Sequence, residues 1–164
     1  MTVDAILSAD AAATHRAGVL LGRLARAGDV IALAGGLGAG KTALVQGLAA
    51  GLEVTGHVPS PTFNILLVHP GTLPLNHFDL YRLEHPEQLV DIDFWETLES
   101  GGVSAIEWAD RFPGELPADR LDVVIDIVDE TTRALRPIGT GARSRVLASR
   151  WLEAWDADLR GVRR

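Results

Sequence analysis

The sequence contains no cysteine, a single lysine and no continuous apolar segment of the roughly eighteen residues that a membrane helix needs. Without cysteine the chain has no disulfide, no thiolate zinc site and no cysteine nucleophile. Together these absences favour a cytoplasmic protein that does not enter a membrane.

Basic residues are also fewer than acidic ones: 15 Lys and Arg stand against 22 Asp and Glu, for a formal net charge of −7. Proteins that hold bare nucleic acid gain most of their affinity by neutralising phosphates with basic side chains. We therefore expect no tight, direct binding of RNA or DNA by this chain alone. Binding as part of a complex stays open.

Apolar segments of two kinds alternate along the 164 residues. Short apolar runs predict strands over residues 30–34, 63–68, 73–78, 103–106 and 121–128. Apolar residues at helical spacing predict helices over residues 10–27, 43–51, 86–98 and about 149–160, the last with Trp151, Leu152, Trp155 and Leu159 on one face. We expect one domain over residues 1–164, and the alternation favours a three-layer α/β architecture.

Residues 35–42 match the pattern G-x-x-x-x-G-K-[ST] in full, and they contain the only lysine of the chain. Glycines let a tight loop turn successive backbone N–H groups toward a phosphate at the N-terminus of the next helix. Lys41 would reach the β- and γ-phosphates, and the Thr42 hydroxyl would ligate Mg²⁺. The pattern predicts a P-loop NTPase-like domain with a mixed, mainly parallel central sheet. Its expected nucleotide-binding residues are Gly35, Gly36, Leu37, Gly38, Ala39, Gly40, Lys41, Thr42 and Ala43.

The sequence does not support two alternative interpretations of this loop, a dinucleotide-binding site and a GTPase. Residues 38–43 also match G-x-G-x-x-A, but a dinucleotide site needs an acidic residue about 20 positions later, and residues 58–61 contain none. A GTPase would carry N-K-x-D, which is absent, and the only D-x-x-G begins at Asp158 in the C-terminal tail. We therefore expect no preference for GTP.

A P-loop needs a carboxylate partner for the metal, and the sequence offers Asp79, Glu107 and Asp126. Asp126 follows an apolar run, but its spacing from neighbouring aspartates suggests the polar face of an edge strand. Asp79 and Glu107 each follow a predicted strand, at the carboxyl end where open α/β sheets bind ligands. We expect Glu107 and Asp79 to be the pair. Trp108 would either stack on a purine or belong to the core.

Other polar residues carry weaker signals. Ser60 and Thr62 lie in a proline-stiffened segment after the P-loop helix, and Thr62 would act as a switch residue that reaches the metal or γ-phosphate. The five histidines lack metal-ligand spacing, so we expect no zinc site. Four arginines could each supply a phosphate contact: Arg133, Arg136, Arg143 and Arg145.

Four segments taken together resemble one family. They are the P-loop, Ser-Pro-Thr-Phe at 60–63, His-Phe-Asp-Leu-Tyr-Arg-Leu at 77–83 and Ile-Glu-Trp at 106–108. In order and spacing, from about residue 14 to 127, they are similar to the TsaE (YjeE) family of small bacterial ATPases. The second and third segments are more specific than the P-loop. Gly36 departs from the family, which usually has Asp there, but the position contributes only backbone to the loop.

The resemblance implies a Mg²⁺-dependent ATPase of tRNA threonylcarbamoyladenosine synthesis, slow alone and engaged with the TsaB and TsaD subunits. The TsaB and TsaD subunits modify position 37 of tRNA, and this chain would contact tRNA only as part of their complex. The resemblance further implies that Lys41 and Thr42 hold phosphates and Mg²⁺. It implies roles for other residues as well: metal or water positioning by Thr62, Asp79 and Glu107, and approach to the nucleotide by Trp108 and Thr14.

Two other functions use the same P-loop. A small-molecule kinase would add an arginine-rich lid and an acceptor pocket, neither of which the sequence defines. A nucleotide-dependent binding module would not turn over ATP, and a carboxylate such as Glu107 argues against it.

Overall fold

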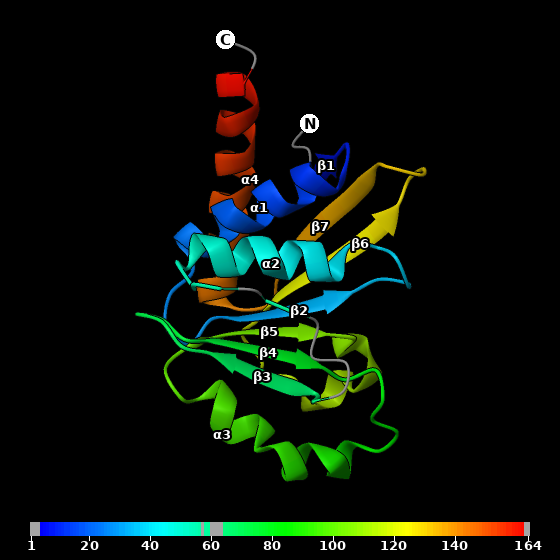
Figure 1. The fold of residues 1–164 in the computed structure, drawn as a ribbon, viewed down its shortest axis with the longest axis vertical. Helices are drawn as coiled ribbons and strands as arrows, with labels where there is room; N and C mark the ends of the chain where they lie inside the picture. Colours follow the sequence, from blue (N-terminus) through cyan, green and yellow to red (C-terminus); the bar gives the residue numbers. More distant parts are fainter. Residues whose placement is uncertain (1–3, 57, 60–63, 163–164) are drawn as a thin grey trace.

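A seven-stranded mixed sheet lies between two helical layers, as Figure 1 shows for the residues that this computed structural model describes, 4–56, 58–59 and 64–162. The strand order is β1-β7-β6-β2-β5-β4-β3. The strands are β1 Ile6–Ser8, β2 Val30–Ala34, β3 Leu66–His69, β4 Leu75–Asp79, β5 Val103–Glu107, β6 Leu121–Ile127 and β7 Arg133–Gly139. The four central strands pair in parallel, whereas the pairs β1–β7, β6–β7 and β3–β4 are antiparallel. The predicted α/β class with a mixed sheet is confirmed.

Each face of the sheet has its own apolar core. On one face lie α1 Ala11–Leu24, α2 Lys41–Gly51 and α4 Ala142–Val162. The other face carries α3 Phe94–Leu98 and the 3₁₀ segments η1 Pro86–Ile92, η2 Ala109–Arg111 and η3 Pro113–Glu115. Along β5, Ala105 packs into the first core and Ile106 into the second, because successive side chains of a strand point to opposite faces. Within the described ranges, no helix combines the length and apolar content that crossing a bilayer requires.

Helices α1 and α2 cross at glycines. Gly18 of α1 faces Gly47 of α2, and Gly22 faces Gly51. A Cβ atom built on Gly47 would lie 2.9 Å from the carbonyl carbon of His15 and 3.0 Å from the Cα of Gly18. The two backbones therefore touch, which fixes the position of α2 and of the loop that enters it.

Two predicted helices differ from the observed ones. The segment predicted as a helix over 86–98 divides at Asp93, whose φ of +50° ends the 3₁₀ turn η1 before α3 begins. The C-terminal helix begins at Ala142 rather than near 149. Asp119 from a distant loop accepts hydrogen bonds from the backbone N–H groups of Arg143 and Ser144, and this cap extends the helix by two turns. Its predicted apolar face is confirmed, since Trp151 and Trp155 are buried in the core.

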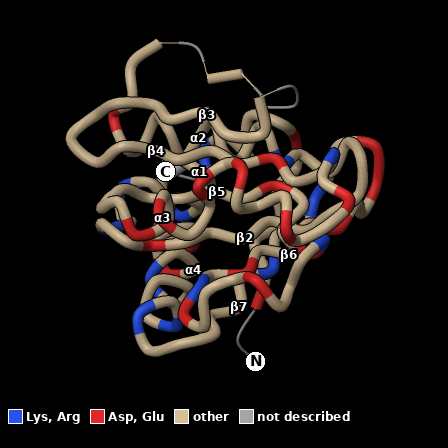
Figure 2. The backbone as a smooth tube through the Cα atoms, turned by 90° about the horizontal axis from the view of Figure 1, so that it is seen from below, with Lys and Arg blue, Asp and Glu red and all other residues tan. Residues whose placement is uncertain are grey.

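The sheet is also larger than the sequence patterns indicated. Strands β1 and β7 were not predicted, because β1 is short and β7 contains two arginines and a proline. The placement of Asp126 on an edge strand is wrong: β6 lies between β2 and β7, and Asp126 pairs with Arg136 at 3.0 Å. Figure 2 shows basic and acidic positions interspersed along the chain in that view.

Candidate nucleotide-binding site

The P-loop connects β2 to α2 at the carboxyl ends of the parallel strands. Its turn requires left-handed backbone at Gly38 (φ +77°) and Gly40 (φ +103°), which glycine adopts without the strain of a side chain. In the strand register, Leu33 of β2 lies opposite Glu107 of β5, which in turn lies opposite Asp79 of β4. Both carboxylates therefore stand beside the loop, at the edge of the sheet where α/β domains bind ligands.

A cavity of about 400 Å³ opens in front of the loop. Its lining residues are Leu37, Gly38, Ala39, Gly40, Lys41, Thr42, Asp79, Tyr81, Glu107 and Trp108. The Thr42 hydroxyl donates to Oε1 of Glu107 at 3.3 Å. Glu107 and Asp79 are only 3% and 6% exposed, so charges on this wall lie in a partly desolvated environment.

Lys41 is buried at the base of this cavity. Its Nζ donates to the carbonyl oxygens of Gly35 at 2.5 Å and Gly36 at 3.0 Å. Burial lowers the pKa of Lys41, while the nearby carboxylates of Glu107, Asp110 and Asp79 oppose that shift. A bound polyphosphate would add negative charge and favour the ammonium form in the same way.

Burial acts in the opposite direction on Asp79. Desolvation raises the pKa of this carboxyl, and the nearby charge of Glu107 raises it further. The backbone N–H of Tyr81, which donates to Asp79 Oδ1 at 3.0 Å, partly offsets the rise. Among the described residues, only Oδ1 of Asp79 has a hydrogen-bond partner, and the charged form of this carboxyl gains from a cation in the cavity.

Two aromatic side chains form the outer wall. The Lys41 ammonium lies 3.9 Å from the centre of a Trp108 ring, within cation–π range. The ring of Tyr81 packs on Trp108 with centroids 4.9 Å apart. Trp108 has a φ of +59°, and this left-handed turn at the end of β5 directs the chain into η2.

A second hollow of about 260 Å³ lies on the other side of the P-loop. It is lined by Asp10, Ala11, Thr14, Gly38, Ala39, Gly40, Ala43, Glu130, Thr131 and Arg133. Thr14 is fixed there by a 2.6 Å hydrogen bond between its hydroxyl and that of Ser8. The Arg133 guanidinium donates to the carbonyl oxygen of Gly38 at 3.1 Å, so the β6–β7 hairpin contacts the loop.

The other predicted residues have separate outcomes. Arg136 and Arg143 form ion pairs elsewhere, with Asp126 and Asp29, and Arg145 lies on α4, outside the lining of both hollows. Of the four predicted arginines, Arg133 is the one that contacts the loop. Ser60 and Thr62 lie outside the described residues. Tyr81 and His77 were not predicted as site residues. Both belong to the segment 77–83, and the alternation of His77, Asp79 and Tyr81 along the sequence, across the end of β4, is the signal that could have found them.

The oxygen donors present suit a hard cation. Thr42, Asp79 and Glu107 offer a hydroxyl and two carboxylates, the donor types that Mg²⁺ takes when substrate phosphates complete its coordination. Among the described residues, no three His, Cys, Asp or Glu side chains gather into a metal site of their own. The site therefore fits a cation that arrives with a nucleotide better than one held by protein alone.

Comparison with known proteins agrees with this geometry. The family model described as "Threonylcarbamoyl adenosine biosynthesis protein TsaE" matches residues 8–135. Proteins named tRNA threonylcarbamoyladenosine biosynthesis protein TsaE are similar: the one from Nostoc sp. is 43% identical over 141 residues, covering 81% of this chain and 86% of its own. The one from Treponema pallidum is 40% identical over 129 residues, covering 79% and 96%.

The fold has a solved counterpart as well. The crystal structure of YdiB from Bacillus subtilis superposes with a TM-score of 0.77 at 30% identity, covering 92% of this chain and 94% of that one. Family model, relatives and structure thus confirm the resemblance drawn from the four sequence segments. The chain belongs to the TsaE family of tRNA threonylcarbamoyladenosine biosynthesis proteins.

Proposed function

We propose that the chain is a Mg²⁺-dependent ATPase that acts with TsaB and TsaD in the threonylcarbamoyladenosine modification of tRNA position 37. One observation carries the proposal: a P-loop lysine and threonine and two buried carboxylates line a single cavity of about 400 Å³. A ligand with phosphates at one end and a metal between them and the carboxylates satisfies all four groups.

Different residues would bind the phosphates, hold the metal and position the water. Backbone N–H groups of the loop and the Lys41 ammonium hold the phosphates, at the N-terminus of α2 where anions are favoured. Thr42, Glu107 and Asp79 would hold Mg²⁺, which when bound neutralises charge on the phosphate oxygens. A carboxylate of the same pair accepts a hydrogen bond from the attacking water. The water oxygen bonds to the γ-phosphorus as the bond to the β–γ bridging oxygen breaks, and ADP and phosphate leave.

We infer that the nucleoside occupies the second hollow. Lys41 and the carboxylates mark the first cavity as the place of the terminal phosphate, so the rest of the nucleotide continues past Gly40 and Ala43. Thr14 lines that path. Trp108 would then contact the phosphate end of the nucleotide rather than stack on the base.

Substitution of Ala11, an exposed residue at the mouth of the second hollow, tests this placement. Ala11→Trp should weaken binding of ATP but leave the affinity for inorganic triphosphate unchanged, whereas Trp108→Ala should weaken both. Equal loss of ATP and triphosphate affinity in the Ala11→Trp variant contradicts the placement. Isothermal calorimetry measures both ligands.

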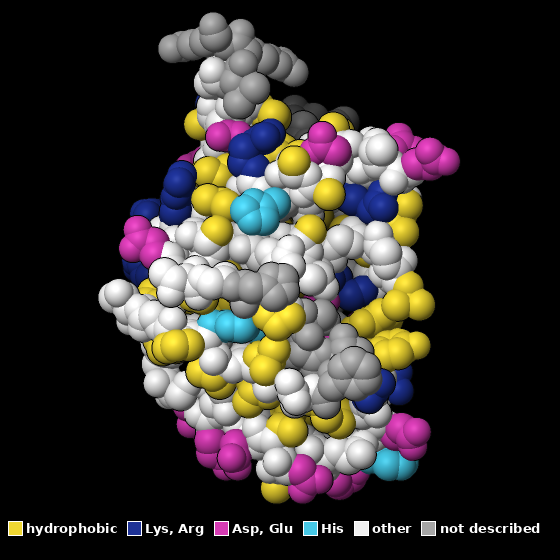
Figure 3. Space-filling view, in the orientation of Figure 1, with side chains coloured by type: hydrophobic (Ala, Val, Ile, Leu, Met, Phe, Trp, Pro, Cys, Tyr) yellow, Lys and Arg dark blue, Asp and Glu magenta, His cyan; other side chains and the backbone are white. Residues whose placement is uncertain are grey.

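The charge distribution supports contact with tRNA through partners. No Lys or Arg occurs between Arg82 and Arg111, and this stretch supplies the exposed acidic residues Glu84, Glu87, Asp91, Asp93, Glu96 and Glu99. Figure 3 shows acidic side chains along the lower edge, over the η1 and α3 layer. A phosphate backbone would be repelled by this face.

The deciding experiment measures ATP turnover by the chain alone and with the TsaB–TsaD pair. Turnover should rise on addition of the pair, with ADP and phosphate as products. Lys41→Ala should abolish ATP binding, and Lys41→Arg should impair it, because a planar guanidinium does not replace a compact ammonium in a tight loop. Arg136→Ala, which removes a half-exposed cation outside the cavity, is the matched control. Transfer of phosphate to a small-molecule acceptor would favour the kinase alternative.

Glu107→Gln separates hydrolysis from binding. The change keeps size and hydrogen bonding but removes the charge. If Glu107 orients water, turnover in the complex should fall about 10²–10⁴-fold with little change in ATP affinity. If it chiefly holds the metal, Mg²⁺-dependent affinity should fall as well. Asp126→Asn, on an exposed ion pair, is the control. Parent-like turnover and affinity would remove Glu107 from the site.

A further inference from the structure

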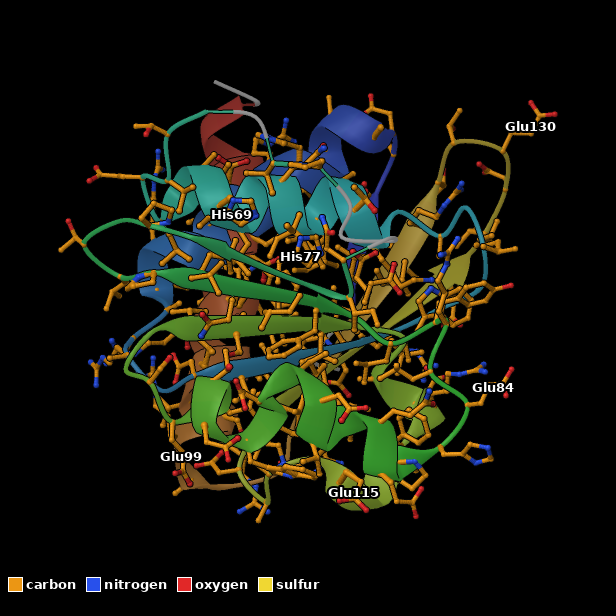
Figure 4. All side chains as sticks on the ribbon, turned by 60° about the horizontal axis from the view of Figure 1, so that its bottom comes forward. His69, His77, Glu84, Glu99, Glu115 and Glu130 are labelled. Atoms are coloured by element: carbon orange, nitrogen blue, oxygen red, sulfur yellow. The ribbon has the colours of Figure 1, made fainter. Side chains whose placement is uncertain are left out.

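A histidine lies beneath the carboxylate pair, on a strand face that is otherwise apolar at that depth. Leu75, His77 and Asp79 alternate along one face of β4, and the neighbouring β5 presents Val103, Ala105 and Glu107 on the same face. His77 is fully buried. Figure 4 shows it on the sheet surface that α2 covers. A polar ring in such a position carries a desolvation cost unless it is hydrogen-bonded.

The His77 ring contacts a residue of the candidate nucleotide-binding site. His77 Nε2 lies 2.5 Å from Oε2 of Glu107, whose other oxygen, Oε1, accepts from the Thr42 hydroxyl. The second ring nitrogen, Nδ1, is buried and has no hydrogen-bond partner among the described residues. Oε2 of Glu107 is the only acceptor that either ring nitrogen meets among the described residues, so we assign Nε2 as the donor. With its hydrogen on Nε2, the ring leaves only an acceptor, and no N–H group, unpaired in the core.

We propose that His77 is a positioning residue that fixes the rotamer of Glu107 by donating from Nε2 to Oε2. A glutamate side chain has three rotatable bonds and would otherwise sample several orientations in a cavity of this size. Holding Oε2 from below directs Oε1 toward Thr42 and the cavity. His77 lies on β4, whose backbone is hydrogen-bonded to β3 on one side and β5 on the other, so the donor is held in place from both sides. The inference rests on the proposed function, since it concerns how Glu107 serves the phosphate site.

Two substitutions of His77 separate positioning from packing. His77→Leu fills the space but removes the donor, and His77→Gln supplies an amide N–H that reaches the position of Nε2. His69 provides the matched control: it lies on β3, on the same face of the sheet. Among the described residues its Nε2, like Nδ1 of His77, is buried without a hydrogen-bond partner. His69→Leu should therefore leave kcat unchanged.

In the complex with TsaB and TsaD, His77→Leu should lower kcat for ATP about 10–100-fold, the effect usual for removing a group that orients a metal-site ligand. Affinity for ATP measured without Mg²⁺ should stay at the parent value, because Lys41 and the loop are untouched. His77→Gln should recover most of the lost kcat. A parent-like kcat in His77→Leu, or a kcat in His77→Gln as low as in His77→Leu, overturns the inference.

A readout without turnover tests the contact itself. Long-range ¹H–¹⁵N NMR of the free parent chain reports which nitrogen of His77 carries the hydrogen. We expect it on Nε2, with a perturbed resonance in Glu107→Ala. A hydrogen on Nδ1 alone overturns the inference, even where the His77 variants do not fold. If the parent neither binds nor hydrolyses ATP while the NMR result is as expected, the proposed function fails and the contact stands.

Discussion

Adding one methyl group at Gly47 should destabilise the protein through the contact between α1 and α2. In Gly47→Ala the new Cβ atom would meet the carbonyl group of His15 and the Cα of Gly18, all backbone atoms. No flexible side chain can move aside, so the helices must separate by on the order of 1 Å to restore ordinary carbon–carbon contact. Overpacking of this kind costs about 1–3 kcal/mol, and a backbone clash belongs at the upper end.

The same substitution also stabilises α2 through helix propensity. Alanine is favoured over glycine inside a helix by roughly 1 kcal/mol. The net loss of unfolding free energy in Gly47→Ala is therefore about 2 kcal/mol, which lowers Tm by roughly 4–8 °C in a chain of this length. Because α2 begins at Lys41, its displacement should also weaken ATP binding.

A matched glycine supplies the control. Gly161 lies in α4, and a Cβ atom there would have no neighbour within 4 Å. Gly161→Ala should leave stability unchanged or raise it by at most about 1 kcal/mol. Urea unfolding followed by the fluorescence of the buried Trp151 and Trp155 measures both variants. Equal or greater stability of Gly47→Ala relative to the parent would refute the close packing of the two helices.

Three further outcomes are expected. In metal-free buffer, Asp79→Asn should be more stable than the parent at neutral pH. Because folding raises the pKa of Asp79 above its ordinary value of 3.8, the parent loses stability as the pH rises through that raised pKa. The difference in unfolding free energy between the two proteins should therefore shrink as the pH falls toward 3.8. Trp151→Phe should cost at least about 1 kcal/mol in urea unfolding, since it removes the 2.8 Å hydrogen bond from Nε1 to the carbonyl oxygen of Ala17; an unchanged midpoint contradicts this. In filter binding at about 0.15 M salt, the chain alone should bind tRNA more weakly than about 1 μM, and a submicromolar constant would show direct contact.

Much of the fold follows from local sequence patterns. The apolar run 30–34, the glycine-rich loop and the helix after it were predicted in the positions observed, because strand and helix formation here depends on neighbouring residues. The predictions were less accurate where a distant group intervenes. Asp119 extends α4 toward its N-terminus, and no pattern within residues 142–149 indicates that cap.

The candidate site divides in the same way. By itself the sequence determined the glycine-rich P-loop pattern, the family and a short choice of carboxylates, since each depends on residue types at fixed spacing. Only the tertiary structure decided which carboxylates join the loop. Parallel pairing of β2, β5 and β4 brings Glu107 and Asp79 beside Thr42, whereas Asp126 pairs with Arg136 outside the cavity lining. It likewise brought His77 to Glu107, 30 residues away in the chain. Strand order and register arise from contacts between distant segments, which local periodicity does not encode.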